Sequence, residues 1–188
     1  MKFTFNDTGI DGLFIVEPTV FGDDRGYFME TYNAEFEPYV KHLDGSPATY
    51  VQDNQSRSKK GVLRGLHSQR TNPQGKLVRV TEGEVWDVAV DLRRNSATYG
   101  KSAGVLLSAE NKRQFLIPEG FLHGFVVLSD FATFTYKCTN FYTPNDECGI
   151  AWNDPDIAAD WHIPDGMEII LSEKDKANPT LREAGLVF

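Results

Sequence analysis

The chain has 188 residues, 40% of them hydrophobic, and includes 13 Phe, 7 Tyr and 3 Trp. This length and composition allow a sizeable core and exclude a disordered protein. We therefore expect one domain spanning residues 1–188. A formal net charge of −8 excludes an overall field that attracts nucleic acid or an acidic membrane, and any anionic ligand must meet a local cluster of cations.

No apolar run reaches the roughly 20 residues of a transmembrane helix, and the N-terminal residues lack the pattern of a secretory signal. Cys138 and Cys148 are the only cysteines and have no CxxC spacing. We expect a soluble, cytoplasmic protein with two unpaired thiols.

The N-terminal third predicts a hairpin, a short helix and a strand. Residues 12–20 and 27–32 flank the turn signal FGDDRG, which places Arg25 at a hairpin tip. Residues 33–42 have apolar side chains at helical spacing after Asn33, a favourable helix cap. Residues 49–54 predict a strand, and the basic run SRSKK at 56–60 favours a solvated loop.

Residues 62–69 predict a strand with unusually polar side chains. Strict alternation places His67 and Gln69 on one face and Arg64 on the other. Gly65 lies between them, and a glycine inside a strand often marks a bulge. One extra residue there brings Arg64 and His67 to the same side.

Residues 76–93 predict a strand, a turn at Gly83 and a second strand, one face of which alternates apolar residues with Asp87 and Asp91. Further strands are expected at 104–107, 113–117, 125–128 and 133–138, and a short terminal helix within 171–178. Short strands separated by turns predict an all-β fold, an antiparallel sandwich or barrel with a few short peripheral helices.

The segment PEGFLH, which ends at His123, resembles the second cupin motif PxGxxH, in which a turn aims a histidine into a jelly-roll barrel. Metal-binding cupins supply HxH in their first motif, but here His67 is followed by Ser68 and Gln69. Two histidines without a third ligand make a poor metal site, so no metal is expected. A metal-dependent cupin oxygenase or ketoisomerase remains the alternative.

A barrel that holds His67, Lys76, His123 and Tyr136 suits proton abstraction next to a carbonyl. A histidine takes the proton, a cation stabilises the enolate oxygen, and a tyrosine on the opposite face returns a proton. Taken singly, His67 is more often a buried histidine that bonds the backbone, and Tyr136 is more often a core aromatic residue. A non-enzymatic cupin that binds a sugar or a nucleotide is therefore a further alternative.

Seven segments together resemble the dTDP-4-dehydrorhamnose 3,5-epimerase family over residues 13–175: FGDDRGYFMETYN, VQDNQSRSKKGVLRGLHSQ, GKLVRVTEGEVWDVAVDLR, LSAENKRQFLIPEGFLHGF, FTYKCTNFYTP, WNDP and LSEKD. The resemblance implies a cupin-like antiparallel jelly-roll barrel and a homodimer whose subunits exchange N-terminal strands, with no metal or cofactor. It implies inversion of C3 and C5 of dTDP-4-dehydro-6-deoxy-D-glucose, which gives dTDP-4-dehydro-L-rhamnose.

The resemblance also assigns roles by motif position. It makes His67 the general base, Asp175 its dyad partner, Tyr136 the proton donor and Lys76 the cation near the 4-keto oxygen. It implies that Arg25 and Arg64 bind the diphosphate and that Phe28 and Tyr142 pack on or near the nucleotide base. The other substrate-binding positions that it implies are Glu30, Gln52, Asp53, Asn54, His123, Glu147 and Lys174.

Two positions depart from the family pattern. Ser68 stands where an aromatic residue is common, and Phe141 stands where a tyrosine is frequent. Either difference alters the shape of the sugar pocket, and small shifts around Tyr136 decide how many carbons are inverted. An enzyme that inverts only C3 or only C5 of a related 4-keto sugar nucleotide is therefore kept as an alternative.

Overall fold

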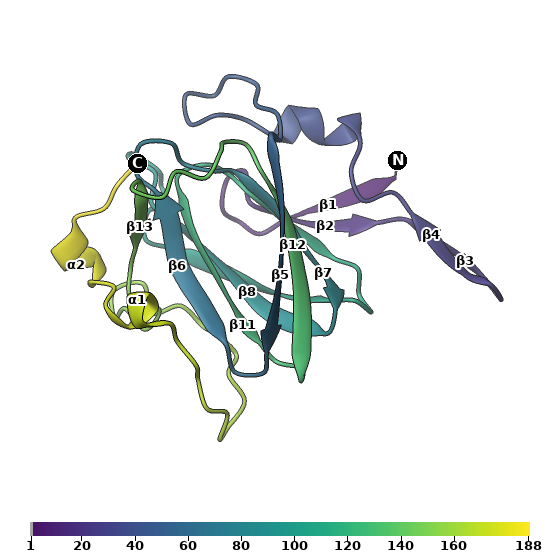
Figure 1. The fold of residues 1–188 in the computed structure, drawn as a ribbon. Coiled ribbons are helices and arrows are strands. Elements are labelled where there is room, and N and C mark those ends of the chain that lie inside the picture. The colour runs from purple at the N-terminus through teal and green to yellow at the C-terminus, as the bar shows by residue number, and fades with distance from the viewer. Residues whose placement is uncertain (1) are drawn as a thin grey trace.

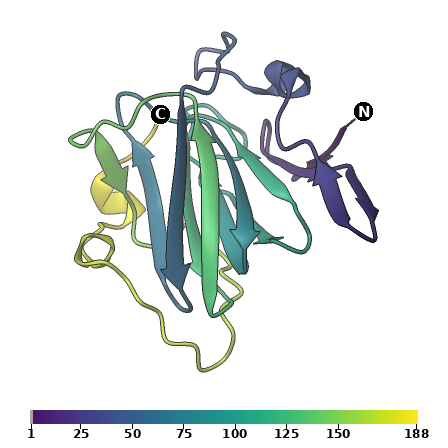
Figure 2. The same cartoon turned by 45° about the vertical axis from the view of Figure 1, so that its right-hand side comes forward.

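The computed structural model describes residues 2–188 as two antiparallel sheets with a projecting hairpin (Figures 1 and 2). The six-stranded sheet has the order β1 (Phe3–Asp7), β2 (Phe14–Pro18), β10 (Gln114–Ile117), β7 (Lys76–Glu82), β12 (Phe131–Cys138) and β5 (Gln52–Lys59). The five-stranded sheet has the order β13 (Glu147–Gly149), β6 (Leu63–Gln69), β11 (Phe121–Val127), β8 (Glu84–Asp91) and β9 (Ser102–Ser108). This is the expected all-β, cupin-like jelly roll.

The main core lies between the two sheets, where alternate side chains of both point inward. Phe115, Phe121 and Phe134 are fully buried in it. A second apolar cluster covers the outer face of the five-stranded sheet, where Trp161 and Leu186 of the C-terminal segment pack against β8 and β11. The five-stranded sheet is therefore buried on both faces.

Strand β8 alternates as predicted, but its polar face is the interior of the barrel. Asp87 and Asp91 are both 0% exposed. Asp87 accepts a hydrogen bond from His123, and Asp91 accepts from Arg93, Ser96 and Thr98. Each buried carboxylate thus has partners, as burial of a charge requires.

The bulge expected at Gly65 is present. Strand β6 pairs with β11 through His67 opposite His123 and Arg64 opposite Phe125, so two residues of β6 face one of β11. Gly65 has φ +120°, and a Cβ there would lie 2.6 Å from the Cα of Gly124. Only glycine fits, and the extra residue brings Arg64 and His67 to one cavity.

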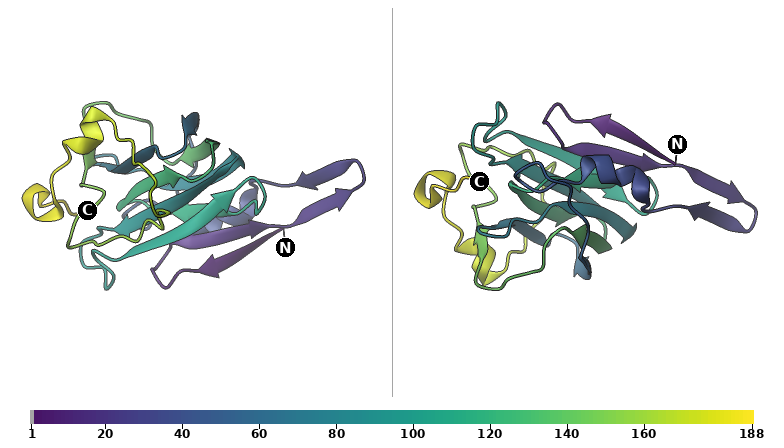
Figure 3. Two further views of the ribbon diagram at one scale, coloured as in Figure 1. Left: turned by 90° about the horizontal axis from the view of Figure 1, so that it is seen from below. Right: turned by 90° about the horizontal axis from the view of Figure 1, so that it is seen from above.

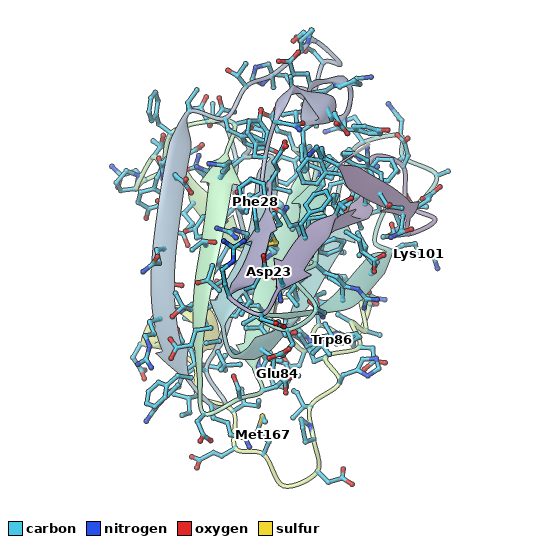
Figure 4. The ribbon with its side chains drawn as sticks, turned by 90° about the vertical axis from the view of Figure 1, so that its right-hand side faces the viewer. Asp23, Phe28, Glu84, Trp86, Lys101 and Met167 are labelled. Carbon is cyan, nitrogen blue, oxygen red and sulfur yellow. The ribbon has the colours of Figure 1, made fainter. Side chains whose placement is uncertain are left out.

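The hairpin formed by β3 (Val20–Asp23) and β4 (Gly26–Met29) extends away from the barrel (Figure 3). The prediction of a hairpin with Arg25 in its turn is confirmed, although residues 14–18 form the separate strand β2. Figure 4 faces the hairpin and labels Asp23 and Phe28 on it. Asn33 caps the following 3-10 helix, η1 (Ala34–Tyr39), as predicted.

Several local predictions were wrong or incomplete. The run SRSKK lies mostly in β5, which pairs with β12 from Gln52 to Lys59, so the predicted loop at 56–60 is corrected to a strand. The strands β1 and β13 were not predicted, although Phe3 and Phe5 alternate with polar residues in β1; β13 has only three residues, too few for an alternation. Of the two terminal helices, α1 (Glu173–Lys176) was predicted and α2 (Leu181–Ala184) was not.

Neither short helix could cross a bilayer, and no longer apolar helix occurs among residues 2–188. Cys138 and Cys148 both carry free thiols.

Candidate active site

A cavity of about 640 Å³ opens between the two sheets. His67 lines it from β6 of the five-stranded sheet, and Lys76 and Tyr136 line it from β7 and β12 of the six-stranded sheet. Lys174 and Asp175 of the C-terminal segment complete one side. All four predicted catalytic residues therefore meet in one cavity, although they are as much as 108 residues apart in the sequence.

His67 and Asp175 form the shortest polar contact in this cavity. The Nε2–H of His67 donates to Oδ1 of Asp175 at 2.5 Å, and the Asp175 side chain is only 4% exposed. Burial raises the pKa of Asp175, but hydrogen bonds from His67 and Ser172 outweigh it and lower that pKa overall. An ionised Asp175 keeps the proton on Nε2, which leaves Nδ1 of His67 as the basic nitrogen.

Glu147 lies on the other side of the His67 ring. Its Oε1 is 3.8 Å from His67 Nδ1, while its Oε2 accepts from Lys174 Nζ at 2.6 Å and from the Tyr142 hydroxyl at 3.0 Å. Burial raises the pKa of Glu147, but Lys174, His67 and Tyr142 lower it overall. Glu147 is thus a negative charge held beside the His67 ring, too far from Nδ1 to hydrogen-bond it.

Lys76 and the His123–Asp87 pair are further titratable groups buried in the barrel. His123 Nε2 is 3.0 Å from both carboxylate oxygens of Asp87, and Lys76 is 8% exposed. Burial lowers the pKa of Lys76, while the nearby Asp87 and Glu147 act in the opposite direction. A cation in such a water-poor site interacts strongly with negative charge that develops on a ligand.

Tyr136 packs beside Phe134, with the ring centroids 5.9 Å apart. Burial is the main cause that raises the pKa of Tyr136 above its ordinary value, so the phenol keeps its proton near neutral pH. Arg64 lines the same cavity, and its guanidinium donates to the Ser58 hydroxyl at 3.2 Å. The cavity therefore combines a histidine, a protonated tyrosine and the cationic side chains Arg64 and Lys76.

Other predicted binding residues take different positions. Tyr142, Glu147, Lys174, Arg64 and His123 line the cavity. Gln52 does not line the cavity, but it contacts a residue that does: its side-chain oxygen accepts from the backbone N–H of Tyr142 at 2.8 Å. Asp53 and Asn54 line a separate hollow of about 320 Å³, where Asp53 pairs with Lys137.

Arg25, Phe28 and Glu30 do not line the cavity of their own chain. The Arg25 side chain is 90% exposed at the hairpin tip and pairs with Asp23, and Phe28 is 64% exposed. Glu30 accepts from Asn33 at 2.6 Å at the base of the hairpin. Folding of a single chain therefore does not bring these three residues to His67.

The sequence reading did not select Ser56, Gln74 and Ser172, which also line the cavity. Ser56 follows from alternation only once residues 52–59 are recognised as a strand. Ser172 has a sequence signal of its own, a serine three residues before an acidic residue at a helix start. Gln74 has no such signal.

Within residues 2–188, no group of three or more His, Cys, Asp or Glu side chains is arranged to hold a metal ion. The two histidines of the cavity, His67 and His123, are paired across β6 and β11, and each bonds an aspartate instead.

A jelly-roll barrel whose cavity joins a histidine–aspartate dyad, a buried lysine and a half-buried tyrosine defines the class of cupin-like isomerases that work by acid–base chemistry. Comparison with known proteins identifies the family within this class. The family model described as dTDP-4-dehydrorhamnose 3,5-epimerase matches residues 7–183. The chain belongs to this family.

Individual relatives agree over nearly the whole chain. The chain is 55% identical to the dTDP-4-dehydrorhamnose 3,5-epimerase of Methanothermobacter thermautotrophicus, over 97% of this chain and 96% of that protein. It is 56% identical to the Escherichia coli enzyme of the same name, over 94% and 93% of the two chains. The crystal structure of the Legionella pneumophila dTDP-6-deoxy-D-glucose-3,5-epimerase in complex with dTDP-4-keto-L-rhamnose matches with a TM-score of 0.88 at 50% identity and covers 96% of this chain and 93% of that one.

Proposed function

We propose that this protein inverts C3 and C5 of dTDP-4-dehydro-6-deoxy-D-glucose and so produces dTDP-4-dehydro-L-rhamnose. The relatives named above carry that activity in their names, and one was solved with the nucleotide of the product sugar. The cavity of about 640 Å³ is within the usual range for a site that encloses a small organic ligand.

The proposed chemistry uses the acidity of carbons next to a ketone. His67 removes the proton from C3 or C5, the C–H electron pair forms a carbon–carbon double bond, and the carbonyl pair moves to the C4 oxygen as an enolate. The ammonium of Lys76 stabilises that oxygen. Tyr136 then donates its phenolic proton to the opposite face of the same carbon, and exchange with solvent restores both side chains.

One observation carries this proposal. His67 and Tyr136 line the same cavity but come from different sheets, so a sugar ring between β6 and β12 has a base on one wall and an acid on the other. Inversion of a stereocentre requires access to both faces. A barrel in which both groups came from one sheet would offer them to the same face.

The test is incubation with dTDP-4-dehydro-6-deoxy-D-glucose in deuterium oxide, followed by mass spectrometry and NMR of the sugar. The proposal predicts two solvent deuterons, one at C3 and one at C5, with inverted configuration at both. A single deuteron would identify a 3- or 5-epimerase instead. An absence of deuterium at both carbons would reject proton abstraction next to the ketone altogether.

We also propose that the protein is a homodimer in which the β3–β4 hairpin of each subunit completes the cavity of the other. Val20, Phe21, Tyr27 and Phe28 are exposed on this hairpin, and a two-stranded ribbon gains little stability in water alone. Its tip carries Arg25, a cation suited to a diphosphate. The hairpin projects away from its own barrel, as an arm that contacts another subunit would (Figure 3).

A further inference from the structure

Ser172 connects the catalytic dyad to the helix that carries it. Its hydroxyl oxygen accepts from the backbone N–H of Asp175 at 3.1 Å and so caps α1. The same hydroxyl donates its hydrogen to Oδ2 of Asp175 at 2.7 Å. The two bonds hold both the backbone and the carboxylate of Asp175.

We propose that Ser172 is a positioning residue of the reaction, which fixes the rotation of the Asp175 carboxylate and through it the orientation of His67. This inference rests on the function proposed above. Because the Ser172 hydrogen is donated to Oδ2, Oδ1 is the oxygen that remains for His67 Nε2. Without this bond the carboxylate keeps only the backbone of Gly65 and His67 itself as hydrogen-bond partners, so its rotation about the Cβ–Cγ axis is less restrained and the imidazole has a less fixed acceptor.

The place of Ser172 is itself fixed by strand β6, which carries the base. Two residues earlier, Ile170 bonds Gly61 and Leu63 at the start of β6, with N···O distances of 2.8 and 3.0 Å. The distance from the β6 backbone to Ser172 is therefore set by paired main chain. A chain of contacts runs from β6 through Ile170, Ser172 and Asp175 back to His67 on the same strand.

The chain contains a matched control in the next helix. Thr180 caps α2, and its hydroxyl accepts from the backbone N–H of Glu183 and donates to the Glu183 carboxylate at 2.8 Å. These are the bonds that Ser172 makes to Asp175. Neither Thr180 nor Glu183 lines the cavity. A variant of Thr180 thus removes a cap without touching the dyad.

The experiment compares Ser172→Ala, Ser172→Thr and Thr180→Ala with the unmodified protein, by the rate of deuterium incorporation at saturating and at limiting substrate. We expect Ser172→Ala to lower kcat about 10- to 100-fold with KM within about twofold, because the base is misplaced while the nucleotide contacts remain. Ser172→Thr keeps the hydroxyl, and the exposed position has room for a methyl group, so kcat recovers to within about threefold. Thr180→Ala leaves kcat unchanged.

A second measurement does not depend on turnover. The proton in the His67–Asp175 bond is expected as a downfield imidazole NMR signal, assigned by its loss in His67→Asn. It should move or broaden in Ser172→Ala and stay in place in Thr180→Ala. Unchanged kcat and an unchanged signal in Ser172→Ala, or equal losses in Ser172→Ala and Thr180→Ala, would overturn the positioning role. If the unmodified protein incorporates no deuterium, the proposed reaction fails instead, and the NMR signal still decides the role of Ser172.

Discussion

The protonation states of His67 and Tyr136 suit the acceptance and the donation of a proton, respectively. The basic nitrogen of His67 faces the cavity opposite a tyrosine that burial keeps protonated. The same burial lowers the pKa of Lys76. Two predictions follow from these states, one for the acid and one for the cation.

Replacing Tyr136 with Phe removes the proposed acid but leaves the base and the cation in place. We expect Tyr136→Phe to keep exchange of the C3 hydrogen with solvent within about tenfold of the unmodified rate, while completed inversion falls by about 100-fold or more. Deuterium NMR and product analysis of the same samples separate the two steps. Equal loss of exchange and inversion would show that Tyr136 does not act as the acid.

The depressed pKa of Lys76 predicts an alkaline limit of activity. The ammonium loses its proton as pH rises through a pKa below its ordinary 10.5, so kcat/KM falls there, whereas the raised pKa of Tyr136 places its titration above 10. In Lys76→Arg the guanidinium stays charged, and any residual activity should show no such fall. The same alkaline limb in both pH profiles would assign it to another group.

At the scale of elements, one bulge sets the geometry of the site. Gly65 lets β6 place Arg64 and His67 in one cavity, and the backbone of Gly124 occupies the space that a side chain at 65 would need. The requirement arises from the close approach of two strands, so it is stricter than a preference for a turn conformation.

Gly65→Ala is therefore expected to destabilise the protein by about 3 kcal/mol or more, because the new Cβ meets backbone that cannot move aside. The control is Gly166→Ala, at φ +77° with no atom within 4 Å of the new Cβ, where a cost of about 1 kcal/mol is expected. Urea unfolding monitored by tryptophan fluorescence measures both. Similar midpoints for the two variants would contradict the proposed crowding at Gly65.

The same elements show how far local pattern predicts this fold. The bulge at Gly65, the cap at Asn33 and the alternation of β8 follow from short-range rules and are confirmed. The prediction of a loop at SRSKK was wrong, because pairing of this segment with β12 outweighs the preference of its charged residues for a loop. Its Ser58 side chain is buried. Which face of β8 is interior depends on the closure of two sheets, and no local pattern contains that information.

At the scale of the whole molecule, the site divides into a part that one chain builds and a part that it does not. The motifs predicted that His67, Tyr136, Lys76 and Asp175 lie together, and these four line one cavity. Arg25 and Phe28 were assigned to the same site, yet they lie on the projecting hairpin. Their place relative to the substrate depends on a second copy, which a sequence pattern alone does not position.

Mixing two inactive variants tests whether the β3–β4 hairpin of one subunit completes the cavity of the other. In a dimer of one Arg25→Ala subunit and one His67→Ala subunit, the cavity that keeps His67 receives an intact Arg25 from the other chain. After unfolding and refolding an equal mixture, we expect about a quarter of the activity of the unmodified protein, since half of the dimers are mixed and each has one complete site. Size-exclusion chromatography with light scattering confirms the mass. No recovery in mixed dimers would place the hairpin's contribution within its own subunit.

The C-terminal segment has two functions that cannot be separated. The C-terminal segment that brings Asp175 to His67 also covers the apolar outer face of β8 and β11 with Trp161 and Leu186. Detachment of this segment would therefore remove the Asp175–His67 contact and expose the apolar outer face of β8 and β11 in the same event.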